Sequence, residues 1–180
     1  MDWGSGLIPI AIGTHIFKLI SIMAKQHIYE TNLVWMGNKG SGTMDYRSYD
    51  RDFTVEIDGK EPISGSSDSV FLGDKSKYNP EDLLLSSVSS CHMLWYLHLC
   101  SKNGIVVIEY KDNAVGTMTE NADGSGKFTE ILLRPQVVIS KPEDISWANS
   151  LHAEANRMCF IASSLNFPVK HQAECTAISG

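Results

Sequence analysis

One stretch of the sequence, Asn79 to Cys100, constrains the fold most, because it has the pattern of a single long helix that is apolar on almost every side. It runs NPEDLLLSSVSSCHMLWYLHLC. Asn79 is a favoured N-cap residue, Pro80 suits the first helical position, and two acids follow in the first turn, where the helix dipole favours negative charge. Asn103 and Gly104 provide a stop. A helix that is apolar all round is expected to be buried.

The segments around this helix have patterns that are typical of strands. Alternating or β-branched runs occupy residues 32–38, 43–59, 105–119, 127–140 and 167–179, with turn-rich stretches between most of them. Ser140 and Glu143 have the spacing of a capping box, which predicts a second helix running to about Leu165. The order of strands, helix, strand pair, helix and strand predicts an α+β fold with antiparallel sheets.

The chain of 180 residues is predicted to hold a single domain at residues 23–180, after a leader or N-terminal extension at residues 1–22. This first stretch lacks the basic region and cleavage pattern of a signal peptide. His15 and Lys18 interrupt its apolar run, which is shorter than the ~20 residues that span a bilayer. Two interpretations stay open: a leader or vector sequence before Met23, which we favour, and a helix packed on the body or on a partner.

Composition excludes several classes of protein. A net charge of -6 without any basic run argues against nucleic-acid binding, and 43% hydrophobic with 20% charged residues is typical of a soluble globular protein, so no membrane partner is expected. The four cysteines (Cys91, Cys100, Cys159 and Cys175) are few and widely spaced, and they form no CxxC pair. We therefore expect neither a disulfide framework nor a zinc ribbon, and we expect a reducing, cytoplasmic location.

Cys91 and Cys159 lie on the seams of the two predicted helices. Steps of three and four place Cys91 in line with Glu81, Leu84, Val88, Trp95 and His98, and Cys159 in line with Ile145, Ala148, His152 and Ala155. Helix residues seven apart are about 10 Å apart along the axis, too far to share one zinc ion, so no metal is expected. Helices packed seam to seam would bring both thiols within bridging distance. Spacing alone leaves this redox pair as one option beside plain core packing, which is our interpretation of Cys100 and Cys175.

Three segments resemble one known family. NPEDLLLSSVSSCH resembles the helix signature of the osmotically inducible and organic hydroperoxide resistance proteins (OsmC/Ohr), in which a reactive cysteine follows ten residues after the glutamate. ANSLHAEANRMCFIASSLNFPV resembles the second-cysteine helix, and LVWMGNKGSGT resembles the N-terminal strand and Gly-rich turn of the OsmC branch. The resemblance covers about Asn32 to Ile178. It implies an OsmC-like fold, with antiparallel sheets around two long cysteine-bearing helices, and an intertwined homodimer.

The resemblance also implies a function: a thiol-dependent peroxidase that reduces organic (alkyl or lipid) hydroperoxides, without a cofactor, and is restored by a dithiol reductant. By this carry-over Cys91 is the peroxidatic cysteine and Cys159 the resolving one, and Glu81 with an arginine completes the site. YDRDF resembles the Arg-Asp pair of the Ohr branch, which indicates Arg51, with Arg47 as the second candidate. A guanidinium would hold the Cys91 thiolate, which is the form that attacks a peroxide.

The sequence departs from the family in two places and sets one geometric condition. Phe160 stands where many relatives have proline, and the stretch just before Asn-Pro-Glu, SDSVFLGDKSKY, holds no arginine where the OsmC branch often has one. Glu81 and Cys91 are ten residues apart, about 15 Å on a straight helix, so one arginine cannot contact both in an unbroken helix. Either the helix bends in residues 86–90, or Glu81 and the arginine meet Cys91 across the dimer interface. Apolar neighbours predict a pocket that favours organic hydroperoxides; they are Met93, Leu94, Trp95 and Phe160.

Two other functions compete with the peroxidase. One is a Cys-His hydrolase, with Cys91 as the nucleophile and His152 or His92 as the base. No glycine-rich turn flanks Cys91 to supply an oxyanion hole, which weighs against this hydrolase. The other is a non-catalytic binding protein with the same fold, an alternative that the missing upstream arginine favours.

Overall fold

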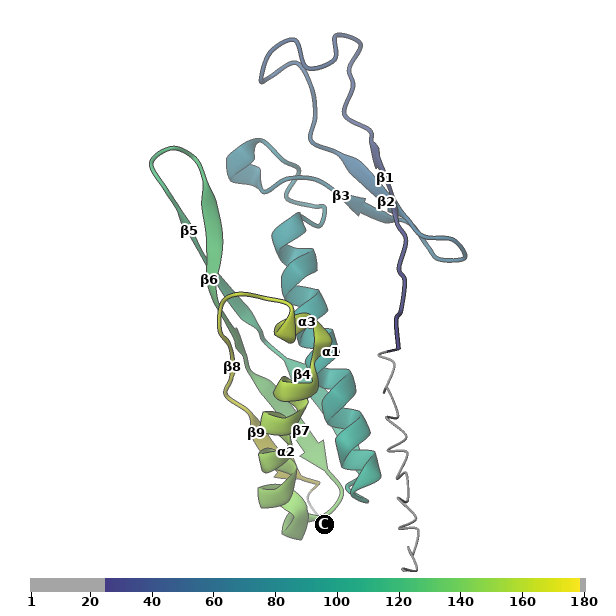
Figure 1. The fold of residues 1–180 in the computed structure, drawn as a ribbon, viewed down its shortest axis with the longest axis vertical. Coiled ribbons are helices and arrows are strands. Elements are labelled where there is room, and N and C mark those ends of the chain that lie inside the picture. The colour runs from purple at the N-terminus through teal and green to yellow at the C-terminus, as the bar shows by residue number, and fades with distance from the viewer. Residues whose placement is uncertain (1–24, 179–180) are drawn as a thin grey trace, which may run out of the picture. The chain divides into compact units, whose positions relative to one another are not determined.

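The computed structural model describes residues 25–178. The chain divides into two units, Met1–Glu30 and Thr31–Gly180, and the second contains every helix and strand that the structure describes (Figure 1). The predicted leader at residues 1–22 lies outside the described residues.

The long helix predicted from Asn79 is confirmed as α1 (Pro80–Lys102). The Asn79 side chain accepts a hydrogen bond from the Asp82 backbone N–H at 2.7 Å, and the Asp82 carboxylate accepts one from the Asn79 N–H at 3.2 Å, so the two residues cap the helix reciprocally. Gly104, with φ of 75°, follows the C-cap. In the described chain only α1 is long and apolar enough to cross a membrane, but here it packs against α2, α3 and β4.

The N-terminal strands form a separate antiparallel sheet of three short strands in the order β1-β2-β3: β1 (Asn32–Trp35), β2 (Phe53–Glu56) and β3 (Ile63–Gly65). Leu33 pairs with Val55, and Val55 pairs in turn with Ile63. All four residues of β1 are exposed, Leu33 by 64% of its surface. A three-stranded sheet needs a covered apolar face to be stable, and much of this sheet stays exposed within one chain.

Six strands follow α1 and form two three-stranded sheets, β4-β7-β9 and β5-β6-β8. Their bounds are β4 (Val107–Asp112), β5 (Val115–Glu120), β6 (Gly126–Leu133), β7 (Pro135–Ile139), β8 (Val169–His171) and β9 (Glu174–Ala177). The pairs β4–β7 and β5–β6 are antiparallel, as predicted, whereas β6–β8 and β7–β9 are parallel. The parallel pairs arise because the chain leaves β7 through a helical crossover before it returns to the sheets.

Each of the three strand runs predicted after α1 is divided into two strands, whereas the run predicted at residues 43–59 forms a strand only at Phe53–Glu56. The breaks fall at residues 113–114, at residue 134 and at residues 172–173. Asp112, the last residue of β4, lies directly before the first break. Its carboxylate accepts one hydrogen bond from the Arg134 backbone N–H at 2.7 Å and another from the Ser89 hydroxyl of α1 at 2.6 Å. The same side chain therefore joins two strands to the central helix.

The second predicted helix is interrupted, so the expectation of one helix running to about Leu165 is wrong. A short 3₁₀ turn, η2 (Pro142–Asp144), leads into α2 (Ile145–Met158), and α3 (Phe160–Ser163) follows after one extended residue, Cys159. The predicted capping box is also absent, because Lys141 takes the N-cap position of η2 and makes no side-chain cap. The break falls at Cys159, one of the two cysteines of the predicted redox pair.

The core has two parts, both built on α1. The larger lies between α1, α2 and the sheet β4-β7-β9, and its buried residues are Tyr96, Cys100, Ile105, Val137, Ile139, Ala148, Leu151 and Ala155. The smaller contains Val88, Ile131 and Leu133. Cys100 is fully buried in the larger cluster and half-buried Cys175 packs against it, as the sequence predicted for both.

Candidate functional site

The structure brings Cys91 and Cys159 together. Cys91 lies halfway along α1 and is half-buried, whereas Cys159 is fully buried at the junction of α2 and α3, and both helices contact α1. The two thiols are close enough to interact with each other, and both are free. Two residues 68 positions apart in the sequence thus form one dithiol site.

The environment of Cys159 opposes ionisation. Burial, assisted by the interaction with Cys91, raises the pKa of the Cys159 thiol to about 11. One contact acts in the opposite direction: the Ala162 backbone N–H donates to the Cys159 sulfur at 3.4 Å, so this sulfur is the N-cap of α3. Cys159 therefore stays a neutral thiol near pH 7, which suits a group that reacts second rather than first.

An apolar surface adjoins the dithiol along α1. Trp95 lies one turn beyond Cys91, and the edges of Phe160 and His98 meet it with ring centroids 5.7 Å away in each case. Leu94, Trp95 and His98 line a cavity of about 250 Å³, and Leu94 and Phe160 are 62% and 67% exposed. Leu94, Trp95 and Phe160 therefore belong to the apolar surroundings that the sequence predicts for Cys91.

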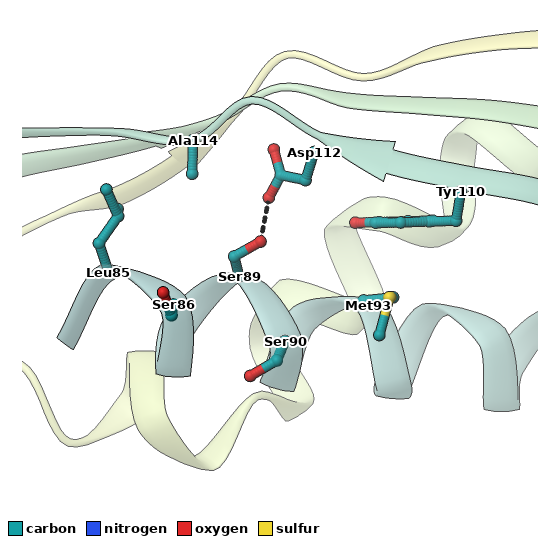
Figure 2. Close-up of a pocket in the computed structure, with 8 residues that line it drawn as sticks. All are labelled: Leu85, Ser86, Ser89, Ser90, Met93, Tyr110, Asp112 and Ala114. Carbon is teal, nitrogen blue, oxygen red and sulfur yellow. Dashed lines mark hydrogen bonds between the residues drawn. The ribbon is translucent and has the colours of Figure 1, made fainter. Parts of the chain in front are cut away.

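Met93 faces a different recess, on another side of α1. It lines a cavity of about 370 Å³ between α1 and the β4–β5 corner, together with three serines and Tyr110 (Figure 2). Figure 2 shows the Ser89–Asp112 hydrogen bond across this recess. Met93 and Cys91 are two residues apart, roughly 200° around the helix, so the prediction that Met93 lies beside Cys91 is wrong.

Arg51 does not reach Cys91 within one chain. Its guanidinium lies between the rings of Tyr46 and Tyr49, 4.3 Å from each centroid, and donates hydrogen bonds to the backbone carbonyls of both tyrosines. Arg47 is exposed, and its backbone N–H binds Asp45. Among residues 25–178 no arginine or lysine makes a hydrogen bond to either thiol of the site.

Glu81 lies in the first turn of the same helix as Cys91. Because α1 is continuous from Pro80 to Lys102, the two residues are about 15 Å apart along its axis. The serine run does not interrupt it: Ser87 and Ser90 donate to backbone carbonyls three residues earlier, and the helix continues. A helix that stays unbroken over ten residues keeps the Glu81 carboxylate away from the Cys91 sulfur of the same chain.

A buried pair of imidazoles, which the sequence pattern did not predict, lies between the same two helices. His92 Nε2 of α1 lies 3.0 Å from His152 Nδ1 of α2, and the rings are nearly coplanar. Tyr96 stacks on His152 at 3.9 Å between centroids, and His171 of β8 lies 6.1 Å from it. His92 and His152 are fully buried, and burial lowers their pKa values to about 4 and about 3.

These imidazoles do not make a catalytic dyad with Cys91. Each uses one ring nitrogen for the other ring, and the remaining nitrogens, His92 Nδ1 and His152 Nε2, are buried without a partner. In the described part of the chain no imidazole hydrogen-bonds to Cys91, so no contact there favours the Cys-His hydrolase. Within the same residues no group of three His, Cys, Asp or Glu side chains has the geometry to hold a metal ion.

Comparisons with known proteins place this geometry in context. A family model described as OsmC-like protein matches residues 73–174. The chain is similar to the structure of an OsmC-like protein of unknown function from Vibrio cholerae O1 biovar eltor, with 31% identity over 83% of this chain and 100% of that one, and a TM-score of 0.75.

More distant solved structures share the fold. One is an organic hydroperoxide resistance protein OsmC from Legionella pneumophila, at 16% identity over 85% of this chain and 100% of that one, with a TM-score of 0.59. Another is the organic hydroperoxide resistance protein OhrB of Bacillus subtilis, at 16% identity over 82% and 98%, with a TM-score of 0.54. No curated protein sequence matches the chain.

Proposed function

The chain belongs to the OsmC-like protein family, and from that premise we propose that it is a thiol-dependent peroxidase that reduces organic hydroperoxides. The family resemblance of the two cysteine segments and the α+β, OsmC-like fold are confirmed. One observation carries the proposal: Cys91 on α1 lies against Cys159 at the α2–α3 junction, beside an apolar cavity. The organic hydroperoxide resistance proteins that share this fold support the same chemistry.

The reaction assigns one step to each sulfur. The Cys91 thiolate attacks the O–O bond of the hydroperoxide, becomes a sulfenic acid and releases an alkoxide that takes up a proton to leave as the alcohol. The Cys159 thiol then attacks the Cys91 sulfur, so a disulfide forms and water leaves. An external dithiol reduces that disulfide by exchange and restores both thiols. Leu94, Trp95 and Phe160 give the entrance an apolar wall, which favours alkyl over hydrogen peroxide.

The protein is proposed to work as an intertwined homodimer. The sheet β1-β2-β3 leaves Leu33, Trp35 and Met36 at least 44% exposed, and α1 is apolar on every side although its Leu94 is 62% exposed. Apolar surface of this extent on a small domain indicates an interface. A second copy would cover both regions at once.

In this dimer Glu81 and Arg51 would complete the thiol site from the second copy. The unbroken α1 excludes a contact of Glu81 with the Cys91 of its own chain, and Arg51 makes only local contacts within its own chain. The two tyrosine rings already fix the Arg51 guanidinium, so it loses little rotational freedom when it binds a thiolate. Arg47 remains the second candidate.

A thiol count tests the peroxidase directly. One equivalent of cumene hydroperoxide should remove two free thiols per chain, and peptide mapping should place both in a Cys91–Cys159 disulfide. Cys91→Ser should abolish consumption of the hydroperoxide with dithiothreitol, whereas Cys175→Ser, a change at a half-buried cysteine outside the site, should preserve it. Oxidation of Cys100 or Cys175 instead, or no thiol loss at all, would reject the proposal and leave a binding protein.

Co-expression tests the contribution of the second copy. Arg51→Ala and Cys91→Ser chains should each be inactive as homodimers. A purified heterodimer of the two should recover one active site, because the intact Cys91 then faces the intact Arg51. An inactive heterodimer would refute the trans arrangement, and the same experiment with Arg47→Ala distinguishes the two arginines.

A further inference from the structure

We infer that the hydrogen bond between His92 and His152 is the tie that sets α1 against α2 at the spacing where Cys91 and Cys159 join. This inference rests on the proposed function, because it assigns positioning residues to the dithiol. In residues 25–178 this bond is the only one that links a side chain of α1 to a side chain of α2. Around it, Tyr96 of α1 stacks on His152, and apolar residues of both helices pack in the larger core cluster.

The location of the pair links it to both sulfurs. His92 is the residue after Cys91, so any shift of its backbone moves the Cys91 sulfur as well. His152 precedes Cys159 by seven residues on α2, about two turns along a rigid helix. Apolar burial is non-directional, whereas a hydrogen bond of 3.0 Å between two buried ring nitrogens sets both the distance and the orientation of the two rings.

The surroundings hold both rings in place. Tyr96 of α1 covers one face of His152 at an interplanar angle of 8°, and His171 of β8 lies 5.8 Å from His92 and 6.1 Å from His152. A buried imidazole that loses its partner is left with another polar atom unsatisfied in the interior. Core packing alone does not require two histidines here, because two leucines would fill a similar volume without any unpaired nitrogen.

The hydrogen bond between the two rings requires that at least one of them is neutral. Burial lowers the pKa of both rings and so favours the neutral form. The titratable groups that face the pair are Tyr96 on α1, His171 on β8 and Asp112 on β4. Of these only Asp112 is a carboxylate, and it already accepts hydrogen bonds from the Ser89 hydroxyl and the Arg134 backbone N–H. Acid should therefore open this interior and separate the thiols.

The test measures how readily the two thiols join, without any peroxide. The protein is equilibrated at pH 7.5 with reduced and oxidised glutathione, which forms the protein disulfide and two reduced glutathiones, and the Cys91–Cys159 fraction is measured by peptide mapping. His92→Leu and His152→Leu should each lower the equilibrium constant about tenfold, or about 30 mV in midpoint potential. Ser101→Ala and Ser146→Ala, exposed positions on α1 and α2, serve as controls and should not change it.

A rescue variant separates the tie from general packing. Glutamine can place its amide where His92 has Nε2, and asparagine can place its amide where His152 has Nδ1, so His92→Gln/His152→Asn should restore the wild-type constant. Well-folded leucine variants with an unchanged constant, or a double variant that fails to recover it, would overturn the tie. Disulfide formation without peroxide consumption would leave the tie in place and reject only the peroxidase.

Discussion

Acidification should destabilise this protein before its carboxylates are protonated, because two neutral imidazoles are fully buried. In the unfolded chain a histidine has a pKa of about 6.5, whereas burial lowers the pKa of His92 to about 4 and that of His152 to about 3. Between these values the unfolded state binds protons that the folded state does not. The free energy of unfolding is therefore at its full value above pH 6.5 and falls as the pH drops toward 4.

The loss is large enough to measure. Between pH 7.5 and pH 5 this difference in proton binding lowers the free energy of unfolding by about 2 kcal/mol for each ring. The pair together accounts for roughly 4 kcal/mol. The lower limit of pH 5 avoids the range where exposed carboxylates with lowered pKa values also lose their contribution; these include Asp74, Asp123 and Glu154.

The assay is urea unfolding followed by tryptophan fluorescence at both pH values, at one fixed protein concentration because the chain is proposed to dimerise. His92→Gln/His152→Asn provides the reference, because neither amide titrates. Wild type should lose roughly 4 kcal/mol of unfolding free energy between pH 7.5 and pH 5, and the double variant should lose less than about 1 kcal/mol. Equal losses in both proteins would refute this reasoning.

Three further substitutions test the fold around the site. Asp112→Ala removes the acceptor that joins Ser89 to the Arg134 backbone and should lower the free energy of unfolding by about 2–4 kcal/mol in urea. Asn79→Ala removes the α1 cap and should cost about 1 kcal/mol, seen as a shift in the urea midpoint with an unchanged slope. Gly37→Ala should cost about 3 kcal/mol or more, because its Cβ would lie 1.7 Å from the Asp50 carbonyl oxygen; a smaller cost would mean that this turn adjusts freely.

Capping residues close in the sequence made the start of α1 predictable, whereas no such residue indicated the break between α2 and α3 at Cys159. Asn79 and Pro80 specify the start of α1 within a few residues, whatever the rest of the chain does. Around Cys159 the helical spacing continues, and no proline or glycine marks an end. The cap of α3 is a thiol, which is not among the side chains that usually cap helices, so no sequence rule indicated it.

Contacts between distant residues could not be predicted in the same way. His92 and His152 are 60 residues apart, and their pairing depends on how α1 and α2 pack, which the sequence pattern does not specify. The pattern instead placed His98 on the seam with Cys91, and His98 is exposed. The sandwich of Arg51 between Tyr46 and Tyr49 is local, but it occurs in a segment without regular secondary structure, where side-chain spacing gives no direction.

Cys159 is the single residue between two helices, and this has a consequence beyond its chemistry. A sulfur drawn toward Cys91 would turn the backbone at one position, and the next side chain, Phe160, would turn with it. Because Phe160 is 67% exposed, the orientation of its ring at the surface would depend on whether Cys91 and Cys159 are reduced or joined.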